Sequence, residues 1–236
     1  MKKRISILFI AFLTLHLNAQ TAIFNTLLAT NVDEKGTIDY ENIKKNEEKL
    51  DTYLDYLAIT SPKKDWSANK TKAFWVNAYN AYTIKIVLEN YPLKSILKIK
   101  KDGKNAWEIP FAKVGEKIYT LNHIEHEILR KNFKDPKIHV AVNCASNSCP
   151  KLGNFAFTSE NYEAKTTALM KEFINDTTRN KITKKEVQIS EIFNWFKSDF
   201  TEKGSIIDFL NRYSETEITK NATLSYLKYD WSLNDK

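Results

Sequence analysis

The amino-acid sequence predicts an α+β fold, a mainly helical single domain with a small, mostly antiparallel sheet. Segments with helical spacing of apolar residues outnumber the strand-like runs, which are short. Strands and helices also lack the regular alternation that is typical of parallel α/β folds. No Pro/Gly/Ser-rich linker, low-complexity tract or repeat interrupts residues 20–236. We therefore expect one domain over that range.

The first 19 residues have the pattern of a secretory signal peptide. Residues 2–4 are basic, an apolar run extends from Ile5 to Leu17, and residues 17–19 form a small-residue cleavage motif. The apolar run is shorter than the roughly 20 residues that cross a bilayer. We therefore expect a periplasmic or secreted protein without a membrane span, whose mature chain begins near Gln20.

The charge of the chain argues against nucleic-acid binding. Lys and Arg number 36 and Asp and Glu 29; removing the three basic residues of the predicted signal leaves 33, so the formal net charge falls from +7 to +4. The remaining lysine pairs are scattered and have acids nearby, which is typical of a solvated surface. The five glycines stand far apart, which excludes glycine-rich phosphate loops. We expect no nucleotide or other cofactor.

Residues 40–58 and 69–90 predict two helices of different character. In 40–58 apolar residues recur at helical spacing among charged ones, as in an amphipathic outer helix. The second helix ends before Pro92 and is apolar on nearly all sides in its middle, so it should be central and buried. Asn77 and Asn80 lie on one face of it and need hydrogen-bond partners if they are enclosed. They either bridge buried backbone or belong to a binding site.

Residues 109–120 predict a short hairpin that turns at Gly115, and a helix follows over residues 121–133. At about 100° per residue, the apolar residues of this helix form one arc. Glu125 lies inside the arc and His126 at its edge. A carboxylate among apolar neighbours costs several kcal/mol unless it is paired, so Glu125 should be neutral, paired with a cation, or part of a site.

His123, Glu127 and Arg130 point away from that apolar arc. His123 could share a metal ligand cluster with His126 or with Glu127. However, the sequence HIEHE matches neither HExxH nor HxxEH. A solvated helix face is the simpler interpretation, and we expect no metal.

Residues 138–144 predict a buried strand that ends in a loop of small polar residues. Alternation places Cys144 on one side of this strand and His139 on the other. Further along the chain we expect a helix over residues 159–175, a hairpin over residues 179–188, and two helices capped by Ser190 and Ser205.

Both cysteines of the chain lie in the stretch IHVAVNCASNSCP, at Cys144 and Cys149. Three interpretations of Cys144 stay open. It can be a structural thiol that continues an apolar strand face, or half of a disulfide with Cys149, which an oxidising compartment would preserve. It can also be a nucleophile at the carboxyl end of a strand. The C-x4-C spacing differs from the C-x-x-C of thiol oxidoreductases.

For the nucleophile interpretation, His126 is the best general base. His16 belongs to the predicted signal, and His139 lies on the opposite strand face from Cys144. Successive helix residues diverge by about 100°, so Glu125 cannot easily orient His126. The candidate orienters are the polar side chains of Asn77, Asn80 and Asp230.

Five ordered blocks, FWVNAYNAYTIKIVL, LNHIEHEILR, IHVAVNCASNSCPKL, IFNWFKSDF and YDWSLN, resemble those of the domain of unknown function 547 family. The resemblance covers approximately residues 66–234 and implies an exported bacterial member. It brings no established activity. The polar positions that match the motifs of this family are Asn77, Asn80, Glu125, His126, Arg130, His139, Cys144 and Cys149.

The leading hypothesis is an exported cysteine-dependent hydrolase or acyl-transfer enzyme that acts on a small-molecule or peptide substrate. Cys144 would attack, His126 would take the thiol proton, and Glu125 with Asn77 or Asn80 would maintain the polar geometry of the site. The alternative is a non-catalytic binding or scaffold module whose two cysteines form a structural disulfide.

Overall fold

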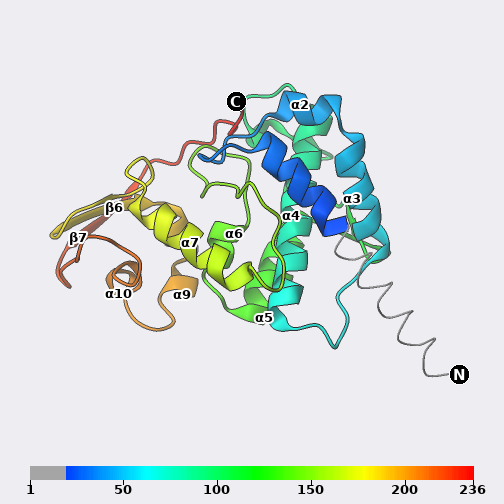
Figure 1. Ribbon diagram of the computed structural model, residues 1–236. Coiled ribbons are helices and arrows are strands. Elements are labelled where there is room, and N and C mark those ends of the chain that lie inside the picture. Colours follow the sequence, from blue (N-terminus) through cyan, green and yellow to red (C-terminus); the bar gives the residue numbers. More distant parts are fainter. Residues whose placement is uncertain (1–19) are drawn as a thin grey trace, which may run out of the picture.

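The computed structural model describes residues 20–236 (Figure 1), and the predicted signal peptide lies outside them. The predicted class is confirmed: the fold is α+β and mainly helical, with sheets of two or three strands. The sheets are antiparallel except for one parallel strand pair. Within the described residues, no helix combines the length and the apolar character needed to span a membrane.

Helix α4 (Ala68–Asn90) runs through the middle of the fold (Figure 1). Ser67 caps it by accepting a hydrogen bond from the backbone N–H of Lys70, and residues 72–84 are buried on every side. The predicted central helix is therefore confirmed. Its burial explains how polar side chains of α4 reach backbone groups of segments far away in the sequence.

Three helical segments lie beside α4 (Figure 1). The predicted helix over residues 40–58 is divided at residues 46–47 into α2 (Tyr40–Lys45) and α3 (Glu48–Ile59). A helix over residues 20–31, which the sequence analysis did not predict, packs into the same core through Phe24 and Leu28. The ring of Phe24 stacks on Tyr53 of α3 at 4.6 Å.

After the short helix η1 (Ile96–Lys98), two hairpins precede the next helix: β1 (Lys100–Lys101) with β2 (Lys104–Asn105), and β3 (Ala112–Val114) with β4 (Lys117–Tyr119). The second one confirms the predicted turn at Gly115. This residue has φ +56°, and a Cβ there would lie 2.6 Å from Ser61 Cβ, so only glycine fits.

The helix predicted over residues 121–133 contains a π-helix, η2 (His123–Arg130), followed by α5 (Lys131–Phe133). Thr120 accepts a hydrogen bond from the backbone N–H of His123 at its start. Near its end the N–H of Lys131 reaches the carbonyl of His126, five residues earlier. π-helices are rare and frequent at functional sites.

The prediction of a strand over residues 138–144 is wrong. Residues Ile138–Ala141 form the short helix α6, and only from Val142 is the backbone extended. Asp135 accepts a hydrogen bond from the N–H of Lys137 through Oδ1, and Pro136 follows it. The N-cap of α6 is Lys137, which has no side-chain cap, so the bond to Asp135 belongs to the turn that leads into the helix. All four residues of α6 are buried. The alternation of apolar residues in the sequence therefore did not mark one buried and one exposed face of a strand.

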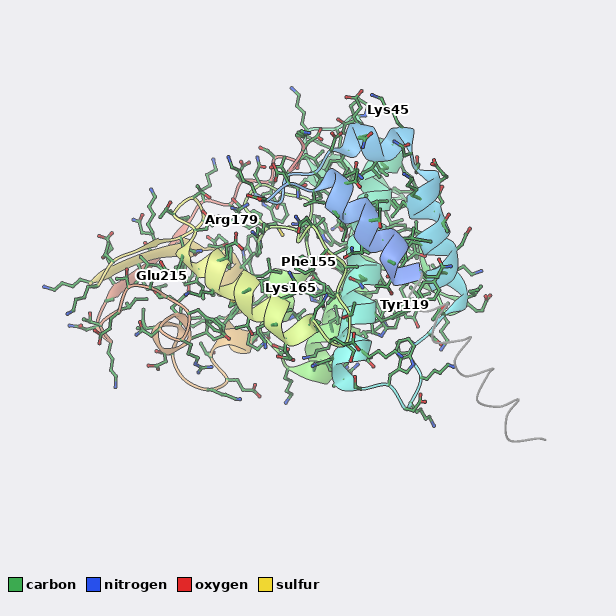
Figure 2. The ribbon with its side chains drawn as sticks, viewed as in Figure 1. Lys45, Tyr119, Phe155, Lys165, Arg179 and Glu215 are labelled. Atoms are coloured by element: carbon green, nitrogen blue, oxygen red, sulfur yellow. The ribbon has the colours of Figure 1, made fainter. Side chains whose placement is uncertain are left out.

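The last third of the chain begins with α7 (Tyr162–Asn175), which packs on α4 and α6. Lys165 of α7 lies over the ring of Phe155, 4.3 Å from its centroid (Figure 2). The predicted hairpin is confirmed as β5 (Lys181–Ile182) with β6 (Glu186–Ser190), and β7 (Thr223–Leu227) pairs with β6 in parallel. Between β6 and β7 lie α8 (Ile192–Trp195), α9 (Lys197–Phe200) and α10 (Ile206–Leu210).

The C-terminal segment returns from the sheet to α2 (Figure 1). On its way it pairs with two loops, through bridges of Leu233 with Ser146 and of Asp235 with Ile38. The backbone N–H groups of Asn147 and Ser148 also donate to this segment. The tail therefore fixes the loop that contains both cysteines.

Candidate active site

A cavity of about 190 Å³ brings together four of the residues singled out in the sequence: Glu125, His126, His139 and Cys144. Its other walls are mainly aromatic and come from α4, the segment between β2 and β3, the region of α8 and the C-terminal segment. The aromatic lining residues are Tyr79, Trp107, Trp195, Phe196, Tyr229 and Trp231. A thiol, a carboxylate and two imidazoles therefore meet in a largely apolar hollow.

The sulfur of Cys144 is surrounded by hydrogen-bonding groups. Its Sγ lies 3.1 Å from Oγ of Ser146 and 3.3 Å from the hydroxyl of Tyr229. Ser146 donates to the hydroxyl of Tyr229 at 3.0 Å, which leaves the Tyr229 proton free to point at the sulfur. Burial raises the pKa of Tyr229 well above its ordinary value, so this group keeps its proton. Donors at this position favour a thiolate.

The thiol of Cys149 adds a further hydrogen bond to Cys144. This bond is the largest cause that lowers the pKa of Cys144; burial acts in the opposite direction, and Ser146 and Tyr229 support the lowering. Burial and the neighbouring sulfur raise the pKa of Cys149 well above its usual range. Both cysteines are free, so the disulfide of the alternative hypothesis is not formed in the structure.

The turn after Cys144 has a strained backbone. Ala145 has φ +56°, a left-handed conformation that costs a non-glycine residue about 1–3 kcal/mol. Oδ1 of Asn143 holds it by accepting from the N–H of Ala145 at 2.9 Å, while Nδ2 donates to the carbonyl of Pro150. The N–H of Cys144 donates to Sγ of Cys149 at 3.1 Å. This turn brings the second sulfur against the first.

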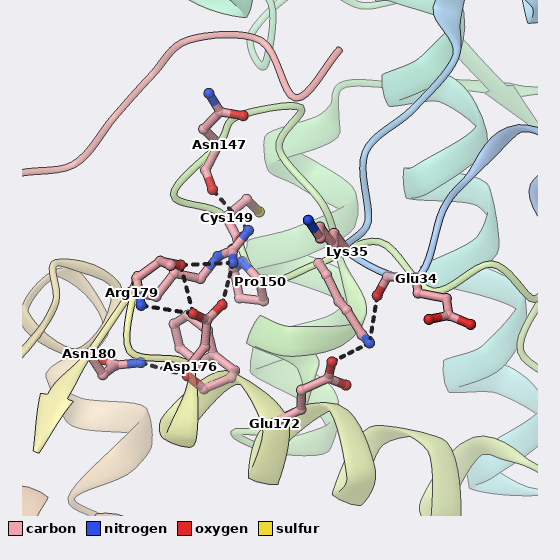
Figure 3. Close-up of polar contacts among 12 residues, drawn as sticks. Glu34, Lys35, Asn147, Cys149, Pro150, Glu172, Asp176, Arg179 and Asn180 are labelled. Atoms are coloured by element: carbon pink, nitrogen blue, oxygen red, sulfur yellow. Dashed lines mark hydrogen bonds and ion pairs between the residues drawn. The ribbon is translucent and has the colours of Figure 1, made fainter. Parts of the chain in front are cut away.

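An arginine from outside the loop holds its far end (Figure 3). Arg179 donates through Nε to the carbonyl of Cys149 at 2.8 Å and through Nη2 to the carbonyl of Asn147 at 3.0 Å. Its Nη1 forms an ion pair with Asp176, which follows α7. The loop is therefore tied to the end of a rigid helix.

Asn77 and Asn80 of α4 have different hydrogen-bond partners. Asn80 donates to the carbonyl of Ala141 and accepts from the N–H of Asn143, both at 2.9 Å, so it fixes the backbone that leads into Cys144. Asn77 makes the same pair of bonds with the backbone of Phe157 and lies away from the cavity. Of the two, only Asn80 supports the cysteine loop directly.

Glu125 is buried at the edge of the cavity, as its place in the apolar arc predicted. Burial is the largest effect on its pKa and raises it, against the lowering effects of His126 and of a hydrogen bond from Tyr79. The hydroxyl of Tyr79 in turn accepts from Nε1 of Trp107 at 3.2 Å. Glu125 thus holds its proton to a higher pH than an exposed glutamate does.

His126 has a fixed tautomer because of Arg130. Nη1 of Arg130 lies 3.1 Å from Nδ1 of His126, one helical turn away. A guanidinium can only donate, so Nδ1 is the acceptor and the neutral ring carries its proton on Nε2. The expectation that Arg130 points away from the site is wrong, since the wider turn of η2 lets it reach back to His126. None of the orienters expected from the sequence, Asn77, Asn80 and Asp230, makes this contact.

Asp199 of α9 is a site residue that the sequence analysis missed. It accepts from Nε and Nη2 of Arg130 at 2.7 and 3.0 Å, and from Nε2 of His139 at 2.8 Å. Burial acts to raise the pKa of Asp199, but the bonds from His139 and Arg130 outweigh it and hold the pKa well below its ordinary value. Asp199 is the only acidic residue in the block IFNWFKSDF. That position is the one sequence feature that could have identified it as a site residue.

His139 lies on the same side as Cys144, contrary to the strand-based expectation. The helical turn of α6 directs its ring toward the cavity, where it stacks on Phe196 at 4.2 Å. Burial lowers the pKa of His139, and Asp199 opposes this effect. The guanidinium of Arg130 also lies over the Phe196 ring, 4.6 Å from its centroid. Arg130, Asp199 and His139 thus form a hydrogen-bond network that reaches His126 through Arg130.

Residues 63–174 match the model of a family described as "Protein of unknown function, DUF547". The match supports the domain family expected from the sequence blocks. It includes Glu125, His126 and both cysteines but ends before Asp199 and Tyr229. No curated protein and no solved structure showed a significant match. In residues 20–236 no group of three His, Cys, Asp or Glu side chains is arranged to bind a metal ion.

Proposed function

We propose that the DUF547-family domain matched by residues 63–174 has a cysteine-dependent acyl-transfer or hydrolase activity, with Cys144 as the nucleophile. The observation that supports it most is the position of the Cys144 sulfur, which lines a cavity while receiving hydrogen bonds from the thiol of Cys149 and the hydroxyl of Tyr229. Such donors stabilise a thiolate, which is the reactive form of cysteine. A purely structural thiol needs neither the donors nor the cavity.

In the proposed reaction the Cys144 thiolate attacks the carbonyl carbon of an ester, thioester or amide. A carbon–sulfur bond forms, and the carbonyl π electrons move to the oxygen. The tetrahedral intermediate then collapses, the bond to the leaving group breaks, and the leaving group takes the proton of the Glu125 carboxyl. Water attacks the resulting thioester, returns a proton to Glu125 and releases the acid and the thiolate.

His126 has a different role in this proposal from the one expected from the sequence. With Nδ1 occupied by the Arg130 donor, the ring presents Nε2–H rather than a lone pair to the cavity. We therefore assign to it the hydrogen bond to the developing oxyanion instead of general-base catalysis. The donors around Cys144 make a base for its thiol unnecessary.

The cavity restricts the substrate. Its volume of about 190 Å³ is below the about 300–1,000 Å³ of typical ligand pockets. Three indole rings, from Trp107, Trp195 and Trp231, contribute to its walls, and Trp195 is 46% exposed at the surface. A short apolar acyl group or one peptide side chain fits such a hollow, while the rest of the substrate remains outside.

The experiment uses p-nitrophenyl esters and acyl thioesters of increasing chain length. We expect a burst of product, an acyl group on Cys144 detected by intact mass, and complete loss of both in Cys144→Ala. His123→Ala, on the exposed side of the same helix, is the matched control and should react as the wild type does. Hydrolysis that persists unchanged in Cys144→Ala would exclude the mechanism, as would an acyl group on another residue.

We also propose that the protein is exported and acts in the periplasm or outside the cell. The support is the basic start and apolar run of residues 1–19. Expression of the full chain in a bacterial host, followed by fractionation and mass measurement, tests this. A product in the periplasm that begins near Gln20 is expected, whereas a full-length product retained in the cytosol would contradict it.

A further inference from the structure

In the acyl-transfer mechanism Cys149 contributes only a hydrogen bond, yet several contacts fix its position in the fold. Its side chain is 3% exposed, and its sulfur accepts the N–H of Cys144 at 3.1 Å. Arg179 fixes its carbonyl, and Asn143 fixes the carbonyl of the next residue, Pro150. A serine or a water molecule could supply a hydrogen bond to Cys144 without these constraints.

The two sulfurs lie between two separate hollows. Cys144 lines the aromatic cavity described above, whereas Cys149 lines a polar hollow of about 30 Å³ on the other side of the loop. Lys35, Lys151 and Arg179 contribute to the lining of that second hollow, and Arg179 lies beside Cys149 (Figure 3). The two cysteines therefore have different surroundings, an aromatic cavity at Cys144 and a small polar hollow at Cys149.

We propose that Cys144 and Cys149 are a reversible dithiol–disulfide pair, in which a hydroperoxide oxidises Cys144 and Cys149 then closes the disulfide. The inference uses the same reactive sulfur as the proposed function and rests on its nucleophilic character. The geometry that carries it is the contact of the Cys149 sulfur with the backbone N–H of Cys144 at 3.1 Å, together with the hydrogen bond between the two thiols. The opposite directions of the two pKa shifts agree with an attacking and a resolving partner.

The chemistry balances with one hydroperoxide and two thiols. The Cys144 thiolate attacks the terminal oxygen, the O–O bond breaks, and the alkoxide or hydroxide leaves and takes a proton from solvent; Cys144 becomes a sulfenic acid. The sulfur of Cys149 then attacks the sulfur of Cys144, the S–O bond breaks, and the released hydroxide takes the Cys149 proton as water. Two molecules of a low-molecular-weight thiol reduce the disulfide and restore the pair.

The experiment treats the reduced full chain with one equivalent of hydrogen peroxide and measures its intact mass. The wild type should lose two hydrogen atoms, and peptide mapping should show a Cys144–Cys149 bond that a thiol reverses. Cys149→Ala should instead gain one oxygen atom and be trapped by dimedone on Cys144. Cys149→Ser serves in its place if the alanine variant does not fold, and Cys144→Ala should show neither product.

A wild type that stops at the dimedone-reactive sulfenic acid, as the Cys149 variant does, would overturn the proposal. So would a wild type that takes up no oxidant. Alkylation of a parallel reduced sample by iodoacetamide separates the two proposals. If Cys144 is alkylated rapidly but no disulfide forms, the redox pair is refuted and the nucleophile of the proposed function stands. If Cys144 is not alkylated, both are refuted.

Discussion

Nδ1 of His126 lies 3.1 Å from Nη1 of Arg130, and the same guanidinium makes two hydrogen bonds to Asp199. The carboxylate fixes the guanidinium, which fixes the tautomer of the imidazole. His139 completes the arrangement through its own bond to Asp199. The proton on Nε2 of His126 is thus determined by Arg130 and Asp199, neither of which lines the cavity.

Replacing His126 by Ala should lower kcat for ester hydrolysis by about 10²–10³, the usual effect of removing one oxyanion donor. KM should change little, because the donor acts on charge that develops in the transition state. Steady-state kinetics of His126→Ala and His123→Ala provide the comparison, with the second expected to match the wild type. Equal losses in both variants would remove the role assigned to His126.

The reactivity of Cys144 should depend on pH with a midpoint below that of free cysteine. The hydrogen bond from Cys149, supported by Ser146 and Tyr229, favours the thiolate, so alkylation should remain fast below the ordinary pKa of about 8.5. Tyr229→Phe removes one O–H donor and should move the midpoint upward. The check is the rate of iodoacetamide reaction against pH in both proteins; coincident profiles would show that Tyr229 does not act on the sulfur.

Asp199→Asn should destabilise the fold by about 2 kcal/mol at neutral pH, since hydrogen bonds to a charged partner contribute about 1.5–3 kcal/mol. The folded-state pKa of Asp199 is depressed. Its stabilisation is therefore fully present above the unfolded-state pKa of about 3.9 and is lost as the pH falls toward the folded-state value. Urea unfolding of both proteins at neutral and acidic pH should show a difference that shrinks in acid. A difference independent of pH would contradict the ionised pair.

Glu125→Gln should separate stability from chemistry. Burial raises the folded-state pKa of Glu125, so the carboxyl destabilises the fold above that pKa and not below the unfolded-state value of about 4.3. The variant should be more stable than the wild type in mild alkali and equal to it in acid. Acylation of Cys144 by amides and alkyl esters should fall by about 10²–10⁴, while the burst of p-nitrophenol from p-nitrophenyl esters, whose leaving group needs no proton, should be almost normal.

The matched control for Glu125→Gln is Glu127→Gln, in which the altered side chain is solvated and paired with Lys131. It should leave the leaving-group dependence unchanged. An equal loss of acylation rate with all substrates in Glu125→Gln would show that Glu125 supports the geometry of the site rather than supplying a proton to the leaving group.

Local patterns were enough to predict the fold class and several elements. The apolar middle of residues 69–90 required a buried helix, and Gly115 marked a turn that excludes a Cβ. The failure at residues 138–141 is equally local: alternation of β-branched residues favoured a strand, but these four residues form one helical turn that is buried throughout. Where every side is buried, periodicity no longer distinguishes the two.

The composition of the site was only partly predictable. Glu125 could be found because a carboxylate inside an apolar arc requires a reason. Asp199 and Tyr229 could not, because their contacts join residues 60 and 85 positions apart along the chain. No periodicity encodes such pairings. The sequence of residues 123–130 likewise does not distinguish the π-helix that brings Arg130 to His126 from an ordinary α-helix.

The central claim is that the fold makes the Cys144 sulfur a reactive thiolate at the edge of the cavity. The most direct measurement is the alkylation rate by iodoacetamide at a pH about two units below the ordinary cysteine pKa, in the native protein and in the same protein unfolded in urea, with the modified residue identified by mass. The account predicts modification at Cys144 in the native state, at least about tenfold faster than in the unfolded chain. A native Cys144 that reacts no faster than the unfolded one would contradict it.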